Sequence, residues 1–138
     1  MQIKRTATAV WHGTGKEGAG KVSTQSGVLN HNQYSFNTRF ADGKGTNPEE
    51  LVGAAHAACF SMKLAFVLQE MSFIPESIDT IATVILESGN IGEIMLNTSI
   101  KANGLTTDKM NEAVNNAKEN CPISKLFKAN ITVSATLL

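Results

Sequence analysis

Three side chains, those of His56, Cys59 and Cys121, are capable of nucleophilic, acid–base or metal chemistry. His56 and Cys59 are three residues apart, so a helix would place them on one face. The other cysteine is Cys121. A domain of 138 residues needs no disulfide for stability. The two cysteines therefore leave three alternatives: two inert buried thiols, a redox pair, or one reactive thiol with a bystander.

Metal and nucleotide sites are weaker interpretations of the same sequence. His56, Cys59 and Cys121 supply three soft ligands, but no fourth ligand is near in sequence. Residues 15–21, GKEGAGK, have the spacing of a phosphate-binding loop, yet Val22 stands where a magnesium-binding Ser or Thr is required. The segment after this loop reads as a strand, so no helix begins there. We expect no metal, nucleotide or other cofactor.

Composition and charge exclude several classes of partner. Twelve Lys and Arg balance twelve Asp and Glu, so no surplus of positive charge favours nucleic acid or an anionic membrane. The first residues have the charges of a signal peptide but no apolar stretch after them. The apolar run Leu51–Phe60 is short and interrupted by Gly53 and His56. We expect a soluble, cytoplasmic protein that can self-associate.

The predicted helices and strands that position these residues do not follow a repeating βαβ order. Strands are expected over 3–11, 21–26, 34–40, 78–87, 93–102 and 130–138, and helices over 46–71, 107–120 and 124–128. Thr46 or Asn47 can cap the first helix, and Thr107 or Asp108 the second. The first helix is apolar on nearly all sides, so it is expected to be buried in its own domain or against a second subunit. The order of elements predicts one α+β domain over residues 1–138, with antiparallel sheets around a long buried helix.

Several motifs together resemble the OsmC/Ohr family over nearly the full length. The helix segments, with His56 and Cys59, resemble the active-site helix of the OsmC branch, and the segment at Cys121 resembles the second cysteine motif. The ranges that carry the resemblance are Ser26–Asn30, Phe36–Phe40, Gly45–Leu51, Gly53–Met62, Ser77–Thr80 and Cys121–Lys125.

The resemblance implies a thiol peroxidase for organic hydroperoxides and, more weakly, hydrogen peroxide. By analogy, Cys59 attacks the peroxide and becomes a sulfenic acid, Cys121 condenses with it, and an external dithiol, such as a dihydrolipoyl protein, resets the pair. Arg39 is the matching residue for activating Cys59, which needs a lowered thiol pKa. The apolar residues Ala55, Met62 and Phe66 are expected to line the pocket for the organic group.

The family also holds its arginine with a carboxylate, and helix geometry favours Glu49 over Glu50. At ~100° per residue, Glu49 lies about 80° around the helix from Cys59, whereas Glu50 lies about 180° away. Glu49 is nevertheless roughly 15 Å along the axis from the thiol. We therefore expect a homodimer with each active site at the interface, as the resemblance also implies. The competing hypothesis is a non-enzymatic dimer that binds a hydrophobic ligand and has inert thiols.

Overall fold

The computed structural model describes all 138 residues, which form two compact units. Met1–Leu51 make up the first unit and Val52–Leu138 the second. Each unit contains one three-stranded sheet. The two units are described separately below.

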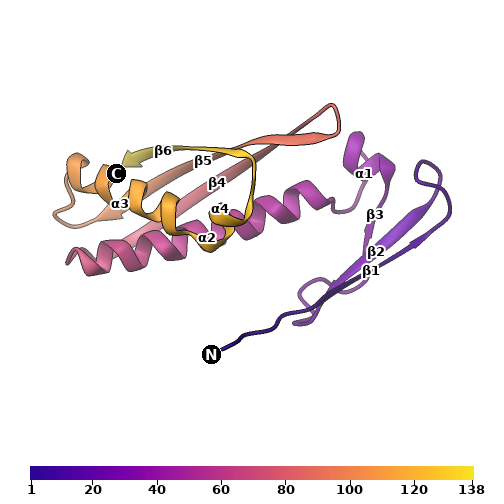
Figure 1. The fold of residues 1–138 in the computed structure, drawn as a ribbon, viewed down its shortest axis with the longest axis horizontal. Coiled ribbons are helices and arrows are strands. Elements are labelled where there is room, and N and C mark those ends of the chain that lie inside the picture. The colour runs from indigo at the N-terminus through magenta and orange to yellow at the C-terminus, as the bar shows by residue number, and fades with distance from the viewer. The chain divides into compact units, whose positions relative to one another are not determined.

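The first unit is an antiparallel sheet followed by a short helix (Figure 1). Strands β1 (Ala7–His12), β2 (Ala19–Thr24) and β3 (Asn32–Tyr34) lie in that order. The glycine-rich segment forms the turn between β1 and β2, and a strand follows it as expected. Helix α1 spans Phe36–Phe40.

The expected strand over 34–40 is wrong, because the chain turns into α1 directly after Tyr34. Ser35 is the N-cap, and its hydroxyl accepts a hydrogen bond from the Thr38 amide at 3.2 Å. The Ser35 amide in turn donates to the Thr38 hydroxyl at 2.8 Å. This reciprocal capping outweighs the alternating pattern of the side chains. Arg39 therefore lies on a helix rather than on a strand.

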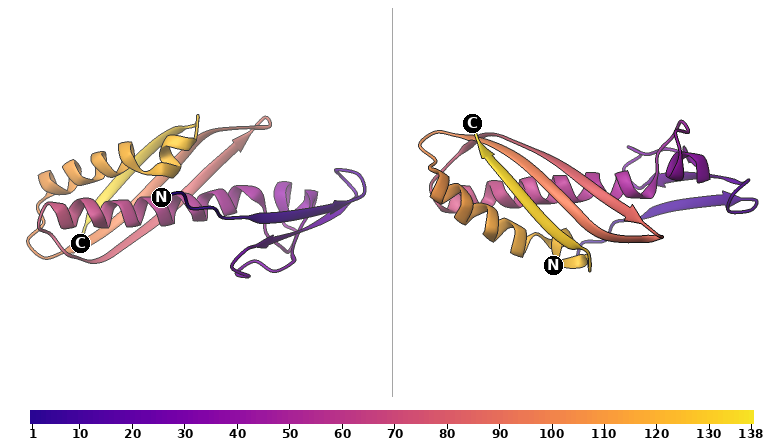
Figure 2. Two further views of the ribbon diagram at one scale, coloured as in Figure 1. Left: turned by 60° about the horizontal axis from the view of Figure 1, so that its bottom comes forward. Right: turned by 90° about the horizontal axis from the view of Figure 1, so that it is seen from above.

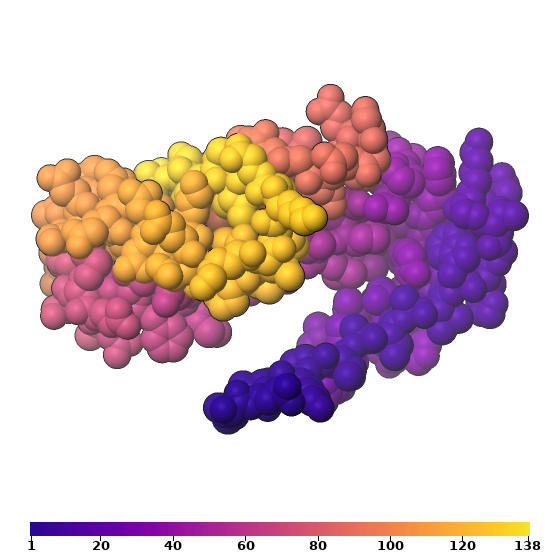
Figure 3. All heavy atoms as spheres, viewed as in Figure 1, coloured from indigo at the N-terminus to yellow at the C-terminus, as the bar shows by residue number.

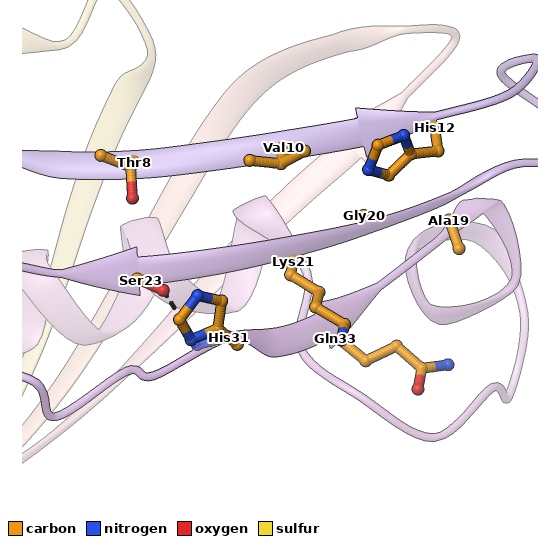
Figure 4. Close-up of a pocket in the computed structure, with 9 residues that line it drawn as sticks. All are labelled: Thr8, Val10, His12, Ala19, Gly20, Lys21, Ser23, His31 and Gln33. Atoms are coloured by element: carbon orange, nitrogen blue, oxygen red, sulfur yellow. Dashed lines mark hydrogen bonds between the residues drawn. The ribbon is translucent and has the colours of Figure 1, made fainter.

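The sheet of the first unit has two dissimilar faces, and neither is well covered. On one face Trp11 and Tyr34 meet over Gly20, where an added Cβ would come within 2.7 Å of either ring. The other face borders a concave pocket with a volume of about 510 Å³, which is lined mainly by polar and small residues (Figure 4). Of residues 1–51, only Gly20 and Thr38 are buried.

Helix α2 (Pro48–Glu70) begins in the first unit and continues through the second. Asn47 caps it, since its side-chain oxygen accepts a hydrogen bond from the Glu50 amide at 2.8 Å. The helix is long and apolar enough to cross a membrane by those two measures, a test that core helices of soluble proteins also pass. One of its faces is buried, with Phe60, Leu64 and Leu68 each at 0% exposure.

The second unit adds a sheet of three long strands and two more helices. Strands β4 (Pro75–Glu87) and β5 (Asn90–Ala102) form an antiparallel hairpin, whose turn places Ser88 and Gly89 at positive φ. Helices α3 (Thr107–Asn120) and α4 (Pro122–Leu126) then lead to β6 (Asn130–Leu137). The cap of α3 is Thr106, one residue before the two candidates.

The expectation of purely antiparallel sheets is wrong for the second sheet, because β6 pairs parallel to β5. Two parallel neighbours need a crossover connection, and α3 with α4 provides it. The chain therefore returns to the start of β5 before β6 begins. Both further views in Figure 2 show α2 and α3 on the same side of this sheet.

The hydrophobic core lies between this sheet and the two long helices. Its buried members come mainly from α2, β5 and α3, and Figure 3 shows α3, α4 and β6 packed as one continuous body. Among them are Phe60, Leu64, Leu68, Ile94, Leu96, Ile100, Met110, Ala113, Ala117 and Cys121. The α+β class expected from the sequence is confirmed.

Replacement of a core residue of α2 tests this packing. Leu64→Ala is expected to lower the free energy of unfolding by about 2–5 kcal/mol, because it leaves a cavity in a fully buried position. The matched control is Leu126→Ala, since Leu126 is 70% exposed. Equal losses in the two variants, measured by chemical denaturation, would contradict the assigned core.

Candidate active site

The two cysteines lie together within the second unit. Their Sγ atoms are 2.9 Å apart, at hydrogen-bonding distance, and both thiols are free. Cys59 is half-buried on α2, whereas Cys121 is fully buried. A redox pair is one of the three alternatives left by the cysteine count. It requires the two sulfur atoms to be close, and they are.

The break between α3 and α4 positions Cys121. This residue ends α3, where its amide donates to the Ala117 carbonyl at 2.9 Å, and it has extended backbone geometry. Pro122 disfavours helical geometry at the residue before it and begins α4. The interruption expected at Pro122 is confirmed, and it turns the Cys121 side chain into the core beside α2.

The surroundings of Cys59 do not activate its thiol. Burial raises the pKa of Cys59, and the hydrogen bond with Cys121 raises it further. A hydrogen bond from the Ile123 amide acts in the opposite direction but is outweighed. The lowered pKa that a peroxidatic thiol needs must therefore come from a further group, such as a cation.

Cys121 has the opposite balance. Burial raises the pKa of its thiol, but the neighbouring Cys59 thiol and the polar groups of Ser124 and Ile123 together outweigh burial. The net pKa of Cys121 is lowered. The two thiols are hydrogen-bonded to each other, so their titrations are coupled.

Arg39 and Glu49 form an ion pair within the first unit. Both the Nε and Nη2 atoms of Arg39 contact Glu49 Oε1, at 2.9 and 2.8 Å. The choice of Glu49 over Glu50 is consistent with this pairing, since Glu50 instead accepts a hydrogen bond from the Thr46 hydroxyl at 2.7 Å. The Arg39 side chain is 40% exposed, and Glu49 Oε2 is buried without a partner. The guanidinium is thus oriented but keeps free donors.

An exposed apolar stripe runs along α2 beside Cys59. Ala55, Met62 and Phe66 lie within about 40° of one another around the helix, and Cys59 lies within about 60° of each. All three are exposed, Met62 at 65% and Phe66 at 56%. The helix is therefore not buried on all sides, and the residues expected to line a substrate pocket form an open surface.

His56 faces inward and contacts a residue that the sequence analysis did not single out. Its Nε2 atom lies 2.7 Å from the Ser124 hydroxyl, and both side chains are buried. Burial lowers the pKa of His56. The available signal for Ser124 was its place three residues after Cys121, at the start of a short helix. No three His, Cys, Asp or Glu side chains are grouped so that they could hold a metal ion.

The buried, neutral imidazole makes stability depend on pH. The unfolded chain protonates His56 near its ordinary pKa of about 6.5, whereas the folded chain resists protonation. Acidification from pH 7 towards pH 5 should therefore lower the free energy of unfolding, with a slope from this group of at most about 1.4 kcal/mol per pH unit. His56→Gln should reduce this slope in denaturation series across that range. The control His12→Gln, at an exposed position, should keep it.

The OsmC-like protein family matches residues 41–136 of this chain. Peroxiredoxin OsmC of Escherichia coli is 47% identical over 141 residues, which cover 99% of both chains. Organic hydroperoxide resistance protein OhrB of Bacillus subtilis is 31% identical and covers 86% of this chain and 89% of its own. The greater identity to the OsmC protein agrees with the branch that the His56 motif favours.

Comparison with solved structures also finds OsmC-like proteins of similar fold. An OsmC-like protein of unknown function from Vibrio cholerae has a TM-score of 0.78 at 16% identity, covering 97% of this chain and 99% of its own. With a family match over most of the chain and nearly full-length relatives, this chain is a member of the OsmC-like family.

Proposed function

We propose that this protein is a cysteine-based peroxidase that reduces organic hydroperoxides to alcohols. The observation that carries the proposal is the 2.9 Å approach of Cys59 Sγ and Cys121 Sγ. The names of the relatives, peroxiredoxin and organic hydroperoxide resistance protein, support the same activity. The half-buried Cys59 is the thiol that a peroxide can reach, and Cys121 is the buried resolving thiol.

The proposed cycle uses both thiols in turn. The Cys59 thiolate attacks the terminal peroxide oxygen, the O–O bond breaks, and the alkoxide takes a proton and leaves as the alcohol. Cys121 then attacks the sulfenic sulfur, and the S–O bond breaks to release water. An external dithiol, with a dihydrolipoyl protein as one candidate, reduces the resulting disulfide.

Arg39 is proposed to supply the activation that the surroundings of Cys59 do not. A cation within 4–6 Å lowers the pKa of an acidic group by about 1–3 units. The Glu49 ion pair orients the guanidinium and leaves donors for the thiolate and the peroxide oxygens. Arginine suits this role because its guanidinium stays charged and presents several N–H groups in one plane.

The site is proposed to be completed by a second copy of the chain. Glu49 precedes Cys59 by ten residues. Glu49, which pairs with Arg39, therefore lies about 15 Å from Cys59 along α2. The first unit has a sheet with only Gly20 buried among its strands, and such a sheet needs a covering surface. The stripe of Ala55, Met62 and Phe66 offers apolar surface beside Cys59. A homodimer would cover these surfaces and enclose a pocket for the organic group.

The proposed setting is the cytoplasm, because two free cysteines suit a reducing compartment. The balanced charge gives no reason to invoke nucleic acid or a membrane as partner. Both units are proposed to act as one functional domain, since the Arg39–Glu49 pair and the cysteines are all required.

Treatment with one equivalent of cumene hydroperoxide tests the activity. The reduced protein should lose two hydrogens in its intact mass, and thiol mapping should join Cys59 to Cys121. Cys59→Ser should consume no peroxide, whereas Cys121→Ser should turn over once and hold a sulfenic acid that dimedone traps. If the wild-type thiols stay free and the peroxide is unconsumed, the activity is refuted and binding of a hydrophobic ligand becomes the better hypothesis.

Complementation between two inactive variants tests the shared site. Arg39→Met should slow the reaction about tenfold or more at neutral pH, in line with the expected pKa change. If Arg39 serves the Cys59 of the other subunit, random dimers of Arg39→Met and Cys59→Ser chains should recover about a quarter of the wild-type activity. Mixtures that stay at the level of the separate variants would contradict a shared site. Light scattering at assay concentration should give the mass of a dimer.

A further inference from the structure

His56 and Ser124 join α2 to α4 inside the second unit. The His56 Nε2 atom lies 2.7 Å from the Ser124 hydroxyl oxygen, and both side chains are buried. The Phe127 ring lies edge-on to the imidazole, with 5.5 Å between the ring centroids. His56 Nδ1 is buried and has no partner, so the Ser124 contact is the only hydrogen bond of this imidazole. Loss of the contact would leave a buried polar ring unpaired, which is costly.

This contact and the contact between the two thiols have the same spacing along both segments. His56 precedes Cys59 by three residues on α2, so their side chains share a face. Ser124 follows Cys121 by three residues, and the Lys125 amide closes the turn that contains both by donating to the Cys121 carbonyl at 3.0 Å. The two sulfur atoms lie 2.9 Å apart. Two helical turns of fixed shape therefore meet at two points.

We propose that the contact between His56 and Ser124 is a clamp that holds Cys121 within bonding distance of Cys59. The proposal rests on the disulfide cycle proposed above, and it makes His56 and Ser124 positioning residues. Apart from the clamp and the thiol contact, no side-chain hydrogen bond joins α2 to the segment 121–126. A thiol is a weak hydrogen-bond donor, so the clamp is the stronger of the two contacts that align the reduced cysteines.

The alignment matters directly after the first peroxide has been reduced. Cys121 Sγ attacks the sulfenic sulfur of Cys59, the S–S bond forms, the S–O bond breaks, and the hydroxyl leaves as water with the thiol proton. A second hydroperoxide competes for the same sulfur, because transfer of its terminal oxygen would give a sulfinic acid and an alcohol. Groups held in bonding geometry react at a high effective concentration. The clamp thus favours the disulfide over further oxidation of Cys59.

The equilibrium between the protein thiols and glutathione tests the clamp without any peroxide. Glutathione disulfide takes two electrons and two protons from Cys59 and Cys121, so the protein disulfide forms and two glutathione thiols are released. The equilibrium constant is the effective concentration of one cysteine toward the other. Ser124→Ala should lower this constant about tenfold, which corresponds to about 30 mV. Without the clamp, the reduced segment gains freedom that disulfide formation must remove again, so the disulfide becomes easier to reduce.

Matched variants separate the clamp from general destabilisation. His56→Gln keeps a polar nitrogen at about the reach of Nε2 and should stay near the wild-type constant. The shorter side chain of His56→Asn does not reach Ser124, so this variant should match Ser124→Ala. Ser61→Ala removes a hydroxyl of α2 that donates to Thr80 at 2.7 Å, on the side of β4, and it should keep the wild-type constant.

The outcomes distinguish the clamp from the peroxidase activity. A constant for Ser124→Ala equal to that of the wild type overturns the clamp, and so does an equal fall in Ser61→Ala. A wild-type protein that forms no disulfide with glutathione disulfide also overturns it. If glutathione disulfide closes the bond and only Ser124→Ala and His56→Asn lower the constant, but peroxide leaves the wild-type thiols free, the peroxidase proposal fails and the clamp stands.

Discussion

The contact between α2 and the break at Pro122 is the constraint on which the rest of the site depends. A continuous helix from Thr107 onward would carry Cys121 around its axis and away from Cys59. The extended geometry at Cys121 instead directs its sulfur into the core, where it lies 2.9 Å from Cys59 Sγ. The parallel pairing of β6 with β5 follows from α3 and α4, which return the chain across the sheet before β6 begins.

The two thiols are close neighbours with opposite electrostatic surroundings. Burial dominates at Cys59, whereas hydrogen-bond donors dominate at Cys121. This division suits a cycle in which one sulfur meets substrate and reductant and the other is protected from both. Within the second unit, the groups that lower a thiol pKa act chiefly on Cys121, so the proposed activation of Cys59 would have to come from a further group.

Much of the fold and site could be predicted from the sequence, for identifiable reasons. Helix α2 has a proline start, acidic residues in its first turn and a long apolar run, so its ends were recognisable. The 100° helix spacing separated Glu49 from Glu50, and the ion pair with Arg39 agrees with that choice. The segment at Arg39 was misread because its alternation mimics a strand while Ser35 and Thr38 cap a helix. Ser124 was overlooked because its contact is with His56, 68 residues away.

The separation of the cysteines along the chain has a consequence for the energy landscape of the protein. Cys59 and Cys121 are 62 residues apart, so a bond between them closes a long loop in the unfolded ensemble. By loop-closure entropy alone, such a cross-link disfavours unfolding by about 4 kcal/mol. Each oxidation would therefore tighten the second unit and each reduction would loosen it. In the proposed catalytic cycle, the second unit would then resist proteolysis and heat more in its oxidised form than in its reduced form.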